Sequence, residues 1–349
     1  MSKSETAYPE TDCISNRYDA VALIQAVMTN PNGTPDATNA PRQDMETDIG
    51  YMTDACIKSN IRAAESVLCE GIPGYENLIR DSNSINKDIA IAYEEILGAD
   101  TFAGKTKKAA KDLTAGHEKE AAALLCYRFF DVRSFGAVLS TGLNAGQVRG
   151  PVQVSMPLSV DPIEPEEITI TRKAYTSDAA TRESCEAEDA KKPSDEKRTM
   201  GRKAFIPYGL YVVKISISAN LAKKTGFSNA DLDVLLKSIM LMYNDTISSS
   251  KMGMSVLSPL VLFKHVGTQG EGNAEQNMRE AMLGCAPSYK LFDLLQIERK
   301  ENVPVARSYK DYNCSLNLSA LPKGVVCGLK DSAFEDVRWI DKREDIKLF

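Results

Sequence analysis

Histidine is scarce in this sequence, and its scarcity excludes much metal and catalytic chemistry. There are two histidines, His117 and His265, and eight cysteines, none of which form a C-x-x-C pair. Zinc sites are usually built from such close pairs, so we predict no metal site and no cofactor. His117 lies in a polar segment and His265 ends an apolar run, and neither has a motif partner.

Motifs of the common nucleotide-dependent and nucleophilic enzymes are missing as well. There is no Walker phosphate loop, no G-x-S-x-G elbow and no H-E-x-x-H motif. A two-metal nuclease needs converging carboxylates. Asp54, Asp131 and Asp161 are candidates, but no pattern groups them. We therefore predict no enzyme activity and no catalytic residues, although a site assembled from distant residues stays open.

Long apolar runs are also absent. No stretch approaches the roughly 18–20 apolar residues of a membrane span, and the first residues, MSKSETAYPETDC, are polar. We expect a disordered tail over residues 1–15 rather than a secretory signal, no membrane partner and a cytoplasmic location. The net charge of −6 argues against general coating of nucleic acid, but a basic groove can exist on an acidic protein.

What the sequence does contain is the pattern of a mixed α/β protein. Residues 17–29, 152–160, 168–173, 210–219 and 256–265 read as strands, and helices are expected after the N-cap residues Thr53 and Ser228. In chain order the core reads strand, helix, strand, strand, helix, strand. This order predicts an α+β fold with a split βαβ, ferredoxin-like sheet, which also serves in RNA-recognition modules.

Two insertions interrupt that order. Residues 71–125 are polar and broken by glycine and proline, with a helix expected at 85–97. Residues 165–205 carry strands at both ends, while their middle, 174–200, has almost no large aliphatic side chains and cannot form a packed core. We predict an inserted subdomain for the first and a mobile loop or protruding, hairpin-like arm for the second.

The stretch from 126 to 154 combines two arginines with a glycine-rich loop. Arg133 and Arg149 stand in short apolar contexts on either side of STGLNAGQ. Main-chain N–H groups and guanidinium groups in such a segment can lie along a phosphate chain. The glycines that would permit this approach are Gly136, Gly142, Gly146 and Gly150. Taken alone, the stretch fits a plain hairpin with two surface arginines at least as well.

The helix expected after Thr53 carries a second pair of cations. Lys58 and Arg62 are one turn apart, on a different face from the apolar Ile57, Ile61, Ala64 and Leu68. A turn signal, Asn30-Pro31-Asn32-Gly33, and a long polar loop precede this helix. The two cations can bind a nucleic-acid backbone or can form an ordinary solvated face.

Three blocks of the sequence together resemble the repeated backbone subunit of type I-C CRISPR Cascade surveillance complexes. The first comprises RYDAVALIQAVMTNPNGTPDATNAPR and TDACIKSNIR, the second DVRSFGAVLSTGLNAGQVRGPVQV, and the third TMGRKAFIPYGLYVVKISISANLAKKTGFS. They span most of residues 16–230 in the family's order, and KLFDLL further on also fits. Ordered agreement over several blocks is far more specific than any single motif.

The resemblance implies a ferredoxin-like, RNA-recognition-motif palm with inserted helical fingers and a projecting β-hairpin thumb. It places palm segments at 16–70, 126–164 and 206–349, the fingers at 71–125 and the thumb at 165–205. The connection from His265 to the distal LF looks longer than is usual in the family. The role of residues 267–286 within it is left unassigned.

The resemblance also implies a non-catalytic role. Family members stack as a helical filament along the guide RNA (crRNA) and leave its bases free to pair with target DNA. The expected partners are crRNA, the complementary target DNA strand, further copies of the chain and the other Cascade subunits (the RNA 5′-end cap, large and small subunits). Two alternatives stay open: an endoribonuclease that acts on structured CRISPR RNA, testable at His265, and a plain structural oligomer.

Carried over to the matching blocks, the resemblance predicts a set of RNA-binding residues from four segments. They are Asn30, Asn32 and Arg42 in the first loop, Lys58 and Arg62 on the following helix, Arg133, Phe135, Gly146, Gln147 and Arg149 in the central block, and Arg172, Met200, Arg202 and Lys203 at the base of the arm. A flexible Met200 could wedge against a splayed base, or could simply pack.

Overall fold

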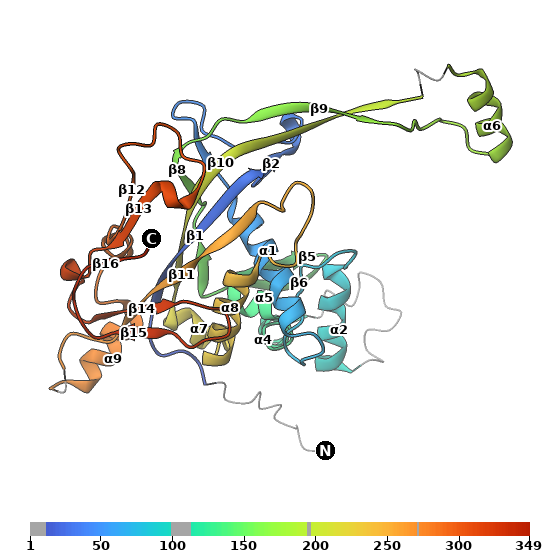
Figure 1. The fold of residues 1–349 in the computed structure, drawn as a ribbon. Helices are drawn as coiled ribbons and strands as arrows, with labels where there is room; N and C mark the ends of the chain where they lie inside the picture. The colour runs from blue at the N-terminus through green and yellow to red at the C-terminus, as the bar shows by residue number, and fades with distance from the viewer. Residues whose placement is uncertain (1–11, 99–112, 194–196, 271) are drawn as a thin grey trace.

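A large antiparallel sheet organises the chain, as the computed structural model shows for residues 12–98, 113–193, 197–270 and 272–349 (Figure 1). The sheet has nine strands in the order β15-β14-β11-β1-β10-β8-β4, and β7 and β9 also pair with β10. Its strands are β1 (Tyr18–Thr29), β4 (Ile49–Tyr51), β7 (Val152–Val154), β8 (Leu158–Pro162), β9 (Glu166–Arg172), β10 (Thr199–Ile217), β11 (Met254–His265), β14 (Val325–Lys330) and β15 (Arg338–Ile340).

The central strand β1 is buried on both faces, which explains its nearly continuous apolar sequence. Ala20, Ala22 and Ile24 point to one face of the sheet, and Val21 and Leu23 point to the other. The strand pairs antiparallel with β10 on one side and with β11 on the other. The strands predicted at 17–29, 210–219 and 256–265 therefore form the middle of the sheet.

Two helices cover the first face of this sheet. Helix α1 (Asp54–Leu68) begins after Thr53, whose hydroxyl accepts a hydrogen bond from the Cys56 N–H at 3.1 Å. Helix α8 (Asn229–Leu241) begins with a capping box between Ser228 and Asp231. Apolar side chains of both helices share one core with β1, as the predicted helical spacing requires. The core elements follow one another as β1, α1, β7, β10, α8 and β11.

The second face is covered by the C-terminal part of the chain. A small sheet in the order β12-β13-β16 lies there, with helix α10 beside it. The bounds of these elements are α10 (Ser288–Phe292), β12 (Leu295–Arg299), β13 (Tyr312–Leu316) and β16 (Ile346–Lys347). Helix α7 (Ala219–Thr225) follows β10, and helix α9 (Ala274–Leu283) lies between β11 and α10.

A second hydrophobic cluster lies beside the main core. It joins α2 (Ile85–Leu97) and α4 (Ala115–Arg128) to a hairpin of β5 (Gly136–Thr141) and β6 (Leu143–Arg149). The prediction that 126–164 consists of strands of the main sheet is therefore wrong for this hairpin, which forms its own two-stranded sheet. Leu139 and Ala145 are fully buried against α2 and α4, so the hairpin packs with the inserted helices. The short helix α5 (Phe130–Phe135) leads into it.

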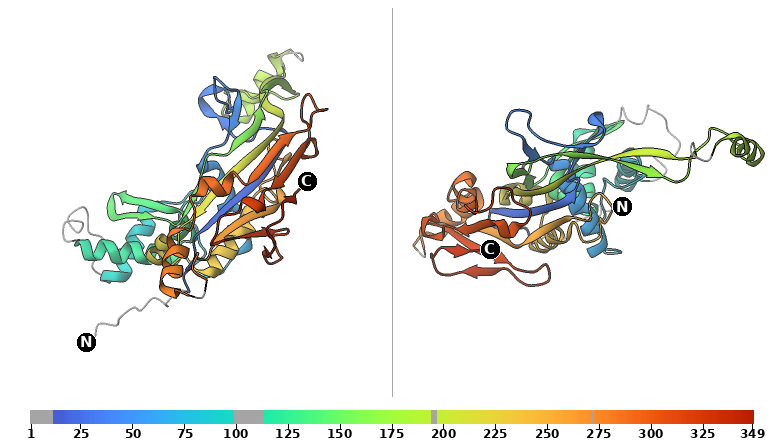
Figure 2. Two further views of the ribbon diagram at one scale, coloured as in Figure 1. Left: turned by 90° about the vertical axis from the view of Figure 1, so that its left-hand side faces the viewer. Right: turned by 45° about the horizontal axis from the view of Figure 1, so that its top comes forward.

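An arm projects from one end of the sheet in Figure 1 and in the right-hand view of Figure 2. It consists of β9 paired with the first residues of β10, from Arg172 opposite Thr199 to Glu166 opposite Phe205. Helix α6 (Arg182–Lys191) lies at its far end and buries none of its residues. From Phe205 onward β10 is largely buried, so one 19-residue strand serves both the arm and the core.

The N-terminal boundary differs from the prediction. Residues 1–11 of the predicted tail lie outside the described residues, but Ile14 is fully buried in the main core. Its N–H donates to the Phe227 carbonyl, so ordered chain begins before residue 16. Among the described residues no helix is long and apolar enough to cross a membrane.

Candidate nucleic-acid interface

The segment between β1 and α1, residues 30–53, is the first loop. Two of the predicted asparagines hold it between the arm and helix α1. Asn30 is buried, and its Nδ2 donates to the Asn39 carbonyl at 2.6 Å and to the Ala204 carbonyl at 3.2 Å. Asn32 Oδ1 accepts from the Thr53 N–H at 2.9 Å, just before α1. Both side chains therefore shape the loop.

Arg42 is the cation that this loop presents. Its main chain bonds Asn32 and Tyr51, which fixes its position beside the start of α1. The Nε atom is buried and has no hydrogen-bond partner among the described residues, and no described carboxylate pairs with the guanidinium. A buried donor without an acceptor is costly. An acceptor supplied from outside the chain would relieve that cost.

Phe135, the last residue of α5, places its aromatic ring against two cations of α1. Lys58 Nζ lies 5.8 Å from the ring centroid and Arg62 Cζ lies 5.3 Å from it, which is cation–π geometry. The ring also lines a groove of about 470 Å³. The other lining residues are Gly136, Ala137, Val138, Gln147, Val148, Arg149 and Gln153. We call this the α1–β6 groove; its lining residues all lie between 135 and 153, and α1 approaches it through the contacts of Lys58 and Arg62 with the Phe135 ring.

The cations at the α1–β6 groove differ in whether a carboxylate already pairs with them. Lys58 pairs with Asp54 at 2.9 Å, and Arg62 pairs with the buried Asp131 at 2.8 Å. Arg149 is exposed, and no residue in the described ranges forms an ion pair with it. Gln147, two positions earlier on the same strand, is also exposed. Arg149 is therefore the groove cation with its charge most available to a ligand.

The glycines of the hairpin serve packing more than access. A Cβ on Gly136 would lie 2.4 Å from the Val148 carbonyl oxygen, and one on Gly150 would lie 2.3 Å from the Ser134 carbonyl oxygen. These glycines let β6 pass directly against the end of α5. Gly146 has a φ of +77° and open space around it, but its N–H donates to Asn144 Oδ1 at 2.9 Å. The predicted binding role of Gly146 thus cannot use its N–H in this arrangement.

Arg133 requires a correction. We predicted that it contacts phosphate, but its side chain is 8% exposed and forms a two-pronged ion pair with Asp231. The remaining N–H groups donate to the carbonyls of Cys126, Tyr127 and Gly74. An arginine has five N–H donors, and these contacts occupy its guanidinium in the interior. Arg133 holds α5, α8 and the chain before α2 together and is not placed to bind RNA.

The four residues predicted for the arm base are more accessible, and they are spread along the β9–β10 ladder, with Lys203 nearest the buried part of β10 and Arg172 at the outer end. Met200 is 75% exposed. Arg202 forms an exposed ion pair with Glu167, which contributes little energy and can be exchanged for another anion. Arg172 donates to the Ala174 carbonyl and to Thr199 Oγ1. Lys203 Nζ donates to the Ser249 carbonyl at 2.8 Å, and no described carboxylate pairs with it.

Comparison with known proteins decides the family. The sequence model described as "CRISPR-associated protein Cas7" matches residues 16–317, which is most of the chain. The chain belongs to the Cas7 family. The resemblance predicted from the three sequence blocks is confirmed at that level.

Solved structures and curated sequences add little to this assignment. One chain of a "CRISPR RNA-guided surveillance complex, pre-nicking" matches at 13% identity and a TM-score of 0.42, covering 71% of this chain and 78% of its own. A chain of a "CRISPR RNA-guided surveillance complex" matches at 13% identity and a TM-score of 0.32, covering 70% and 69%. No curated protein matches.

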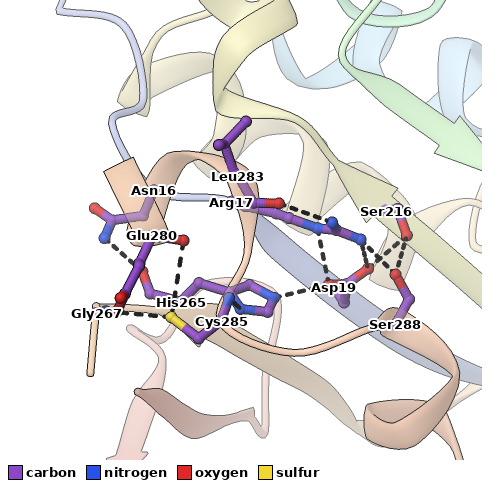
Figure 3. Close-up of polar contacts among 10 residues, drawn as sticks. All are labelled: Asn16, Arg17, Asp19, Ser216, His265, Gly267, Glu280, Leu283, Cys285 and Ser288. Carbon is purple, nitrogen blue, oxygen red and sulfur yellow. Dashed lines mark hydrogen bonds and ion pairs between the residues drawn. The ribbon is translucent and has the colours of Figure 1, made fainter. Parts of the chain in front are cut away.

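A buried polar cluster lies at the opposite end of β1 in this Cas7 family member (Figure 3). Asp19 and His265 are both fully buried, and Asp19 Oδ2 lies 3.0 Å from His265 Nε2. The Cys285 N–H donates to His265 Nδ1 at 2.8 Å, so Nε2 carries the imidazole proton and donates it to Asp19. Both ring nitrogens are therefore occupied, and neither can activate a nucleophile or a substrate.

The same cluster determines the ionisation of Asp19. Burial raises the pKa of this carboxyl, but hydrogen bonds from His265 and Ser216 and the charge of Arg17 outweigh burial and leave the pKa below its usual value. Arg17 also donates to Ser288, and its N–H bonds the Ala281 carbonyl. The cluster thus anchors the segment around α9, residues 267–286, to the start of β1.

Two buried carboxyl groups, those of Glu65 and Asp131, lie under α1. No sequence motif indicated them. Glu65 is fully buried, and burial raises its pKa to about 7, with the charge of Asp131 adding to this effect. Asn77 donates to Glu65. Asp131 accepts from the Leu78 and Ile79 N–H groups as well as from Arg62. The partners are 12 to 69 positions apart in sequence, which explains why spacing alone could not find them.

Proposed function

We propose that this chain is a non-catalytic crRNA-binding backbone subunit of a CRISPR surveillance complex, and that it presents the guide for pairing with target DNA. Membership of the Cas7 family supports the proposal. The observation that carries it is the convergence of predicted site residues: the arm base contacts the first loop through Asn30, and the first loop contacts α1 through Asn32. Helix α1 in turn presents Lys58 and Arg62 to the ring of Phe135 in the α1–β6 groove.

The domain roles follow from this proposal. The antiparallel strand order β11-β1-β10-β7, with α1 and α8 on one face, is the arrangement of a ferredoxin-like palm. The inserted helices with the β5–β6 hairpin are then the fingers, and the β9–β10 arm is the thumb. Type I-C is the subtype that the three sequence blocks favour. Further copies of the chain, the other Cascade subunits and a cytoplasmic location belong to the same proposal.

Phosphate contacts should supply most of the affinity. Arg42, Arg149 and Lys203 have no acidic partner among the described residues, so their charges are available to an RNA backbone. Such contacts carry no sequence information. The guide's bases would then remain free for pairing, as the proposed role requires.

The test is the RNA that purifies with the protein from cells that also express a CRISPR array and the other subunits. A backbone subunit should bring down RNA of one fixed length with varied spacer sequences. RNA of random lengths, or none, would contradict the proposal. The alternative of an endoribonuclease receives no support from His265, which is fully buried with both ring nitrogens bonded.

A further inference from the structure

A turn outside the predicted site lies against the end of β1. Residues 248–252 close on themselves, because the N–H groups of Lys251 and Met252 both donate to the Ser248 carbonyl at 2.9 Å. Thr29 Oγ1 and the Asn30 N–H donate to the Ser250 carbonyl, and Lys203 Nζ donates to the Ser249 carbonyl. This turn, which we call the 248–252 turn, is therefore attached to both the first loop and the arm base.

The attachment is close and depends on a glycine. The Val27 N–H donates to the Gly253 carbonyl at 3.0 Å. A Cβ on Gly253 would lie 1.7 Å from the Val27 carbonyl oxygen, so a residue with a side chain cannot take this position without moving one of the two segments. The turn is consequently held at a fixed place beside β1.

Two exposed methionines flank this junction. Met252 is 80% exposed on the turn, and Met28 is 60% exposed on β1 next to Thr29. Met28 has a φ of +46°, in the left-handed region that residues with side chains seldom adopt. The fold thus accepts backbone strain at a residue whose apolar side chain faces solvent, and strained backbone of this kind is concentrated at functional sites.

Cations surround the same junction. Lys251 and Arg42 both lie close enough to Cys56 for their charges to act on its thiol, where they oppose the dominant effect of burial, which raises its pKa. Lys203 contacts the turn directly. None of the three forms an ion pair with a carboxylate in the described ranges. Uncompensated positive charge beside exposed flexible apolar side chains matches a single-stranded nucleic acid better than a protein surface.

We propose that the 248–252 turn is a second contact for single-stranded RNA, in which Lys251 joins Arg42 on backbone phosphate while Met252 and Met28 contact an unstacked base. The proposal rests on the proposed function, because it takes the RNA that the α1–β6 groove binds and extends its path to the junction of β1, the first loop and the arm base. It adds residues that none of the matching sequence blocks indicated as ligands.

The test is titration of a fluorescein-labelled single-stranded RNA of mixed sequence with the full chain at several salt concentrations. Lys251→Ala should weaken binding about three- to tenfold and lower the slope of log affinity against log salt by about 0.7, the value for one phosphate on a single strand. The double variant Met28→Ala, Met252→Ala should weaken binding to a similar extent with the slope unchanged, because it removes apolar contacts and no charge. Lys290→Ala, which removes a charge on α10, is the matched control and should behave as wild type.

The outcomes separate this inference from the proposed function. If wild type binds RNA and the turn variants bind equally well with an unchanged salt slope, the turn is not a contact and the inference is wrong. If the turn variants keep RNA binding but lose self-association in analytical ultracentrifugation, the turn is a protein contact, which also overturns it. If wild type itself fails to bind RNA, the proposed function fails first. Circular dichroism melting of each variant ensures that lost binding is not lost folding.

Discussion

Arg133 and Asp231 meet in the interior across 98 positions of sequence, with Nε to Oδ2 at 3.0 Å and a second contact from the guanidinium to Oδ1 at 2.7 Å. Both side chains are almost completely buried. The pair joins the helix that precedes the β5–β6 hairpin to the N-terminus of α8. It therefore connects the inserted helices to the helical face of the main sheet.

Removing one partner of this pair should destabilise the protein without a specific effect on RNA. Arg133→Ala would leave the buried Asp231 carboxylate with its Ser228 hydrogen bonds but without a cation, and breaking a buried ion pair in this way typically costs about 3–5 kcal/mol. The free energy of unfolding in urea should fall by that order, while the fraction of protein that stays folded should bind RNA as before. An Arg133→Ala protein of normal stability that has lost RNA binding would show that Arg133 contacts the RNA.

Substitution of Arg149, in contrast to that of Arg133, should weaken RNA binding without destabilising the fold. It is exposed and has no ion-pair partner in the described part of the chain, so Arg149→Ala should leave the unfolding free energy within about 0.5 kcal/mol of wild type. RNA affinity should fall about three- to tenfold, with a salt slope smaller by about 0.7. Fluorescence anisotropy and urea denaturation measure the two quantities. Equal losses in stability and affinity would assign Arg149 a structural role.

The raised pKa of Glu65 predicts that the free energy of unfolding depends on pH. Its pKa is about 7 in the folded chain against an ordinary value of 4.5, so the folded state binds the proton more tightly than the unfolded state does. The resulting stabilisation is complete below about pH 4.5 and is lost as pH rises through 7, a loss of about 3 kcal/mol at most. Glu65→Gln should remove this dependence.

The measurement is the difference in unfolding free energy between wild type and Glu65→Gln at pH 5 and at pH 8. Relative to wild type, the variant should gain stability between the two pH values, because the neutral amide carries no buried charge at either. Other groups titrate equally in both proteins, so they cancel in the comparison. An unchanged difference at the two pH values would show that Glu65 ionises normally in the folded chain.

The Asp19–His265 contact should be structural. His265→Ala leaves Asp19 buried without the hydrogen bond from the imidazole, so we expect a loss of several kcal/mol in unfolding free energy. Purified wild type incubated with structured RNA should show no cleavage that depends on His265. Cleavage by wild type that a folded His265→Ala variant cannot perform would support the endoribonuclease alternative instead.

Local signals predicted the elements of the core well. Thr53 and Ser228 are effective N-caps, and the apolar residues of α1 and α8 follow helical spacing, so both helices start where expected. The sequence of β1 is apolar at consecutive positions because the strand is covered on both faces. These features depend on neighbours within a few positions, which a sequence displays directly.

Long-range contacts determined the features that the sequence did not predict. Arg133 lies between Phe130 and Phe135, and such apolar flanks could have indicated burial, but its partner Asp231 is 98 positions away. The β5–β6 hairpin has ordinary strand residues, and only its packing on α2 and α4 separates it from the main sheet. Lys251 belongs to no motif, and the hydrogen bonds that hold its turn beside β1 join residues more than 200 positions apart.

The proposed function requires that the chain bind the backbone of a guide RNA through charge and without regard to sequence. The most direct measurement is the affinity of the purified chain for guide-like RNAs of unrelated spacer sequence across a range of salt concentrations. We predict affinities that agree within a few fold among the sequences and fall steeply as salt rises. Affinity that depends strongly on spacer sequence, or that does not respond to salt, would contradict it.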